Sequence, residues 1–132
     1  MDVNSNPYLR TQAETSTPGQ LLLKAYKDIL DLVEEAKESI ENNDIISKAK
    51  ALSKASRIVN ILRAALDFEK GGEIAKNLDY LYAVVLDQLA LANANNNVEN
   101  LENVKEILTP LYEAWREAVK KEEGLKSSED ET

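Results

Sequence analysis

The chain has 132 residues, with 24 Asp and Glu against 16 Lys and Arg, and it contains neither Cys nor His. That length suits one domain, and a hydrophobic fraction of 43% is enough for a core. The missing Cys and His exclude disulfides, thiolate metal sites, thiol nucleophiles and imidazole bases. A net charge of −8 argues against nucleic acid and anionic membranes as partners, because both attract clustered Lys and Arg.

The N-terminal end gives no sign of a signal peptide. Residues 1–6 are polar and lack an apolar h-region, and the longest apolar run, residues 80–86, is too short to span a bilayer. We therefore expect no membrane insertion and a location in the cytoplasm.

The first long helix is predicted to begin at residue 17. Thr17 is the expected N-cap, Pro18 occupies the first helical position and Gln20 completes a capping box. Asn42 and Asn43 should end the helix, since Asn tolerates the left-handed conformation found there. Between these ends, apolar residues recur in steps of four and three, at Leu22, Tyr26, Ile29, Val33, Ala36 and Ile40.

Asp44 is predicted to cap the second helix, which should stop between residues 67 and 70, ahead of Gly71 and Gly72. The third helix is expected to begin near Glu73. Its predicted inward stripe is Ile74, Leu78, Leu81, Val85, Gln88 and Ala92. The Asn-rich residues 93–97 should end it.

The fourth helix follows Asn97 and should fade between Lys120 and Gly124. Pro110 falls inside it, but the apolar periodicity continues on both sides, which predicts one kinked helix. The connections are short, so neighbouring helices should be antiparallel. The predicted fold is therefore an all-α, antiparallel up-down four-helix bundle over residues 17–123. An extended N-terminal segment, residues 1–16, precedes it, and a disordered acidic tail, residues 124–132, follows it.

The third helix carries more apolar surface than a bundle helix usually buries. With Leu81 at zero on a helical wheel, Val84, Leu91 and Tyr80 lie on one flank, and Leu89, Tyr82 and Leu86 lie on the other. This arc spans roughly 240°, whereas a typical buried stripe covers a little over 100°. Either the helix is the most central one, or one flank accepts an apolar helix from a partner. The sequence leaves open which flank that would be.

No residue constellation indicates catalysis. The carboxylates of the first helix lie mostly opposite its apolar stripe, which is typical of a solvated face. Gly71 and Gly72 lack the following Lys and Ser or Thr of a phosphate-binding loop. We therefore expect no enzyme activity, no catalytic residue, no cofactor and no metal site.

The chain resembles the flagellar secretion chaperones of the FliS family over about residues 6–121. The resemblance rests on Asn6, Tyr8 and Gln12, on Thr17-Pro18 followed by leucines, and on the stretch 66–78, whose sequence is LDFEKGGEIAKNL. Leu81-Tyr82 and the region of Trp115 also match. Gly19 and Pro110 depart from the family pattern.

The resemblance implies a cytoplasmic chaperone of the bacterial cytosol. Such a protein would bind the disordered C-terminal segment of flagellin, prevent its premature polymerisation and assist its delivery to a component of the flagellar type III export gate. The N-terminal segment would cover part of the client site until a client arrives. We assign client contact to Asn6, Pro7, Tyr8, Leu9, Ile58, Leu62, Ala65, Tyr80, Val84 and Leu91.

Two other classes of protein remain open. One is a structural bundle that self-associates through the same apolar flank, so a monomer or a weak homo-oligomer is expected. The other is an enzyme or cofactor-binding bundle, which the missing His disfavours.

Overall fold

The computed structural model describes residues 17–130. Four helices and no strand make up this part of the chain: α2 (Pro18–Glu41), α3 (Ile45–Ala64), α4 (Phe68–Asn95) and α5 (Val98–Asp130). The predicted N-terminal segment, and with it Asn6, Pro7, Tyr8 and Leu9, lies outside the described residues.

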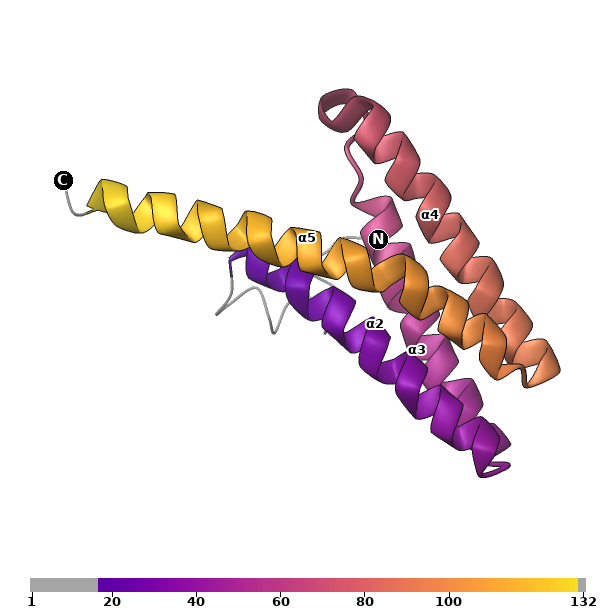
Figure 1. Cartoon of the computed structure of the whole chain (residues 1–132). Helices are drawn as coiled ribbons and strands as arrows, with labels where there is room; N and C mark the ends of the chain where they lie inside the picture. Colours follow the sequence, from indigo (N-terminus) through magenta and orange to yellow (C-terminus); the bar gives the residue numbers. More distant parts are fainter. Residues whose placement is uncertain (1–16, 131–132) are drawn as a thin grey trace.

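The helices form the predicted antiparallel up-down bundle (Figure 1). Connections of two or three residues join them, so each helix returns beside the one before it. Both α2 and α4 pack against α3 and α5. The C-terminal part of α5 extends past α3 and α4, and the first turns of α2 lie beside it.

Local capping explains where α2 and α3 begin. The Thr17 hydroxyl accepts a hydrogen bond from the Gln20 amide at 3.2 Å, and the Gln20 side chain accepts one from the Thr17 amide at 3.3 Å. The Asp44 carboxylate accepts from the Ser47 amide, and Asn43, at φ 57°, makes the left-handed turn between the two helices. These contacts confirm the predicted capping box, cap and turn.

The core is a single apolar cluster to which all four helices contribute. Most of the predicted α2 stripe lies in it, which fits the expected step of four and three residues. Its largest fully buried side chains are Tyr26, Tyr82, Ile29, Leu89, Leu101, Leu108, Val33, Val59, Val85 and Val104.

The boundary between α3 and α4 differs from the prediction. Helix α3 ends at Ala64, and α4 begins at Phe68, because the Asp67 carboxylate caps it by accepting from the Glu69 and Lys70 amides. Gly72 then interrupts α4 with φ 50° and ψ −125°. Regular helix resumes at Glu73, which is the predicted start. The sequence therefore predicted the break at Gly72 but not the capped turn that precedes it.

Replacing Gly72 by alanine should destabilise the protein by about 1–3 kcal/mol. No atom lies within 4 Å of the position that a Cβ would take, so the loss would come from backbone strain alone. A positive φ with this ψ is readily adopted only by glycine. The measurement is the free energy of unfolding from urea denaturation.

The matched control is Gly124→Ala, which also adds a Cβ into open space, but within regular α5. This variant should gain about 0.5–1 kcal/mol, because glycine inside a helix is less favourable than alanine. Equal effects at the two positions would contradict the strain at Gly72.

Helix α5 runs through Pro110 as a single helix, as predicted, but ends later than expected. It reaches Asp130, so it includes most of the residues predicted to form a tail. The Gln20 side chain donates to the Glu123 carboxylate at 3.0 Å, and Val119 is buried against Gly19. These contacts hold α5 against α2 as far as Glu123. The helix continues past Gly124, since a lone glycine costs a helix only about 1 kcal/mol.

Candidate binding surface

One flank of α4 keeps its apolar side chains outside the core. Tyr80 is 68% exposed and Leu91 is 44% exposed, whereas Val84, one turn after Tyr80, is half-buried. Spacings of four and seven residues place these three on one face, which we call the α4 flank. The opposite flank, with Tyr82 and Leu89, enters the core. The structure therefore decides which flank of this helix is at the surface.

Polar contacts on either side fix how α4 is turned. The Asp79 carboxylate accepts from the Arg63 guanidinium of α3 at 2.6 Å. The Gln88 side-chain oxygen accepts from the amides of Asn100 and Asn103 of α5 at 2.9 and 3.0 Å. At about 100° per residue, the α4 flank lies on the outward arc between Asp79 and Gln88. Tyr80 and Leu91 on this arc are therefore exposed.

The other predicted contact residues of the described chain lie on α3 and at its end. Ile58 and Leu62 are half-buried against the core, and Ala65 is exposed at the C-cap of α3. Ile58 is five residues from Arg63, which places it about 140° around α3 from the contact with α4. The α4 flank is similarly turned about 100–140° from Asp79. The two groups therefore form separate surfaces and do not meet across the α3–α4 seam.

Two exposed apolar side chains at the start of α4 were not predicted from the sequence. Ile74 was predicted to face inward, but it is 68% exposed, and Phe68 is 49% exposed. Gly72 breaks the helix between them, so a helical wheel drawn from the later turns does not extend back to Phe68. The prediction for Ile74 was wrong because α4 directs Ala75 inward at this level instead.

A buried pair of tyrosines joins α2 to α4 inside the core. The Tyr26 and Tyr82 hydroxyl groups share a hydrogen bond of 2.6 Å, and the ring centroids are 6.4 Å apart. Burial raises the pKa of both phenols, and the hydrogen bond from Tyr26 raises that of Tyr82 further. For Tyr26, the hydrogen bond with Tyr82 opposes this rise. Both groups therefore stay protonated at neutral pH, which suits a structural contact rather than acid–base chemistry.

A pocket of about 220 Å³ lies where α2, α3 and α4 meet at one end of the bundle. Its lysine, Lys48, is only 4% exposed, and its ammonium donates to the Asn93 carbonyl at 2.9 Å and to the Asn96 side chain. A cation here stabilises the C-terminal end of α4 through its free carbonyls and its dipole. Lys48 therefore holds the α4–α5 turn against α3.

Neither metal coordination nor membrane spanning finds support in residues 17–130. Among the described side chains, those of residues 17–125, no group of three or more Asp, Glu, His or Cys is arranged to hold a metal ion. No helix in that range is long and apolar enough to cross a membrane.

Comparison with known proteins points to a family of flagellar proteins. The model of the family described as flagellar protein FliS matches residues 1–122. The flagellar secretion chaperone FliS of Salmonella typhimurium is 38% identical over 104 residues, which cover 78% of this chain and 77% of that protein. The flagellar secretion chaperone FliS of Campylobacter jejuni is 37% identical over 112 residues, which cover 85% of this chain and 88% of that protein. That of Bacillus subtilis is 31% identical over 120 residues, or 89% of each chain.

A solved structure described as a flagellar chaperone from bacteria has the same fold, with a TM-score of 0.74 at 18% sequence identity, covering 86% of this chain and 93% of that one. The sequence matches span most of each relative's length, so they concern the whole bundle rather than a fragment of it. The chain therefore belongs to the FliS family of flagellar secretion chaperones, which serve flagellar export and are not enzymes.

Proposed function

We propose that this chaperone binds the disordered C-terminal segment of flagellin in the bacterial cytosol, prevents its premature polymerisation and helps deliver it to a component of the flagellar type III export gate. The observation that carries the proposal is the α4 flank, where Tyr80, Val84 and Leu91 remain outside the core. Apolar side chains gathered on one helix face suit an amphipathic partner helix.

The client would be protected by burial of its own apolar face. Each Å² of apolar surface removed from water contributes roughly 25 cal/mol. A disordered segment must first be ordered, which opposes binding and calls for a broad interface. The α4 flank and the group formed by Ile58, Leu62 and Ala65 lie on different sides of the α3–α4 seam. A client that contacts both must therefore wrap around the bundle.

The N-terminal segment completes the proposal. Asn6, Pro7, Tyr8 and Leu9 place an aromatic ring and a leucine in an otherwise polar lead. We propose that they cover part of the client surface when no client is bound and are displaced when one arrives.

Self-association through the α4 flank is the second candidate function, because the same exposed side chains suit a second copy of the chain. The two candidates differ in sedimentation. A chaperone that is a monomer or a weak oligomer should lose any self-association when client is added, whereas a structural oligomer should keep it.

Titration of the full-length chain with a flagellin C-terminal peptide tests the proposal. Binding should give a negative heat-capacity change in calorimetry, because apolar surface is buried, and a large gain of helix in circular dichroism, because the peptide folds as it binds. An unrelated disordered peptide of equal length is the control. No heat and no helix gain at micromolar concentrations would exclude flagellin as the client.

A further inference from the structure

Helix α3 has a charge unlike that of the rest of the chain. It carries five basic residues and no acidic residue, whereas the whole chain has 24 acidic and 16 basic residues. Two of the five have partners inside the bundle: Lys48 binds the end of α4, and Arg63 forms an ion pair with Asp79 at 2.6 Å. The other three lie elsewhere on the helix.

Lys50, Lys54 and Arg57 form a basic face on the outside of α3. Their spacing of four and three residues places them along one side of the helix, and all three are exposed. Among the described side chains, those of residues 17–125, none of the three forms an ion pair with a carboxylate. The nearby Asp44 carboxylate bonds mainly to Ser47, which lowers its pKa, and the charge of Lys50 adds only a small effect.

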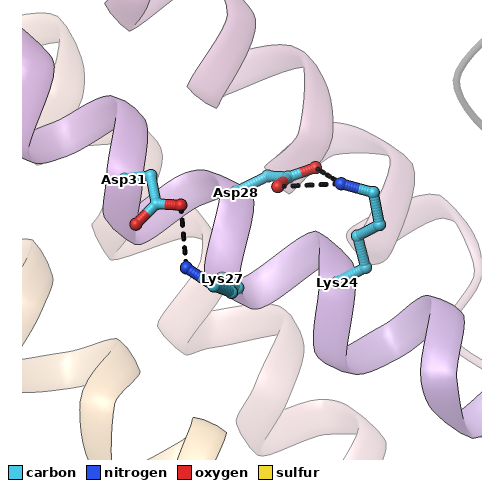
Figure 2. Close-up of polar contacts among 4 residues, drawn as sticks. All are labelled: Lys24, Lys27, Asp28 and Asp31. Atoms are coloured by element: carbon cyan, nitrogen blue, oxygen red, sulfur yellow. Dashed lines mark hydrogen bonds and ion pairs between the residues drawn. The ribbon is translucent and has the colours of Figure 1, made fainter.

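Five other lysines of the bundle form ion pairs with carboxylates of the same chain, whereas Lys70, Lys120 and Lys121 form none with a described side chain. Figure 2 shows Lys24 and Lys27 on α2 directed at Asp28 and Asp31 one turn later, at 3.0 and 3.1 Å. Lys76 pairs with its own helix, and two lysines bridge α2 to α5: Lys37 to Glu102, and Lys105 to Glu34. The basic face of α3 is therefore a positive surface on an acidic protein, and no described carboxylate of residues 17–125 pairs with it.

We propose that the basic face of α3 docks an acidic helical segment of a partner protein, with carboxylates that match the spacing of Lys50, Lys54 and Arg57. This contact goes beyond client binding, since it rests on charge and not on the apolar α4 flank. The face spans about 10 Å along the helix, close to the screening length of physiological salt. A short acidic segment would therefore be attracted by the local positive charge. A long polyanion would also be repelled by the acidic rest of the protein surface.

The probe is a synthetic helical peptide with glutamates at positions i, i+4 and i+7. The control is a scrambled peptide of equal composition. The full-length chain should bind the first peptide better, and binding should weaken as salt rises. The variant Lys50→Gln, Lys54→Gln, Arg57→Gln should lose about tenfold in affinity, because three exposed ion pairs are removed.

The matched control, Lys24→Gln, Lys27→Gln, Lys76→Gln, changes the net charge equally but removes lysines that already have partners. It should bind the peptide like the parent chain. An equal loss in both variants, equal binding of the scrambled peptide, or no binding at about 1 mM peptide would overturn the proposal. So would self-association at low salt that only the α3 variant loses, because the occupant would then be a second copy.

Discussion

Replacing Val84 by glutamate is expected to lower the affinity for a flagellin C-terminal peptide at least about tenfold while the bundle stays folded. Val84 is half-buried on the α4 flank, between the exposed Tyr80 and Leu91. In the free protein a glutamate there can extend its carboxylate into water. A bound client would bury that carboxylate without a partner, which opposes binding. Calorimetry gives the affinity, and circular dichroism gives the helix content.

Ile46→Glu is the matched control for this variant. Ile46 is also apolar and is 71% exposed, but it lies in the first turn of α3, away from the α4 flank. A glutamate there suits the helix dipole, so both folding and client binding should be unchanged. If Val84→Glu unfolds the protein, Val84 belongs to the core. Leu91→Glu, at a 44% exposed position, then still tests the flank.

The helix starts of the first half of the bundle follow from a few local residues. Thr17 and Gln20 cap each other, and Asp44 binds the Ser47 amide, so both helix starts are set by neighbours within four positions. The α3–α4 boundary was predicted less well. Asp67 caps a short turn before Gly72, and neither the cap nor the turn has the apolar periodicity on which the prediction relied.

The exposed flank could be predicted only in part. The sequence showed that α4 is too apolar for one buried stripe, but which side is covered depends on the contacts of α3 and α5 with Asp79 and Gln88. Those contacts join residues far apart in the chain, beyond the reach of helical periodicity. The same limit explains Ile74, since the sequence does not show that Ala75 would be the residue directed inward after the break at Gly72.

The buried hydroxyl groups of Tyr26 and Tyr82 should be coupled, so that removing one of them costs more stability than removing both. Removing one hydroxyl, by Tyr26→Phe or Tyr82→Phe, leaves the other buried without this partner. Each change should destabilise the protein by about 1–3 kcal/mol. The two single changes should cost similar amounts, because each leaves the other hydroxyl buried without its hydrogen-bond partner. Urea denaturation gives the free energies.

The double variant Tyr26→Phe, Tyr82→Phe is the decisive comparison, because replacing both partners by apolar rings of the same shape leaves no hydroxyl unsatisfied. It should be close to the parent chain in stability, and additive losses would contradict the coupling. Raising the pH supplies a second readout. Tyrosines of the unfolded chain ionise with an ordinary pKa of about 10, whereas burial raises the pKa of both native phenols, so these stay protonated above that pH. The parent should therefore lose stability as the pH rises beyond about 10, and the double variant should lose less.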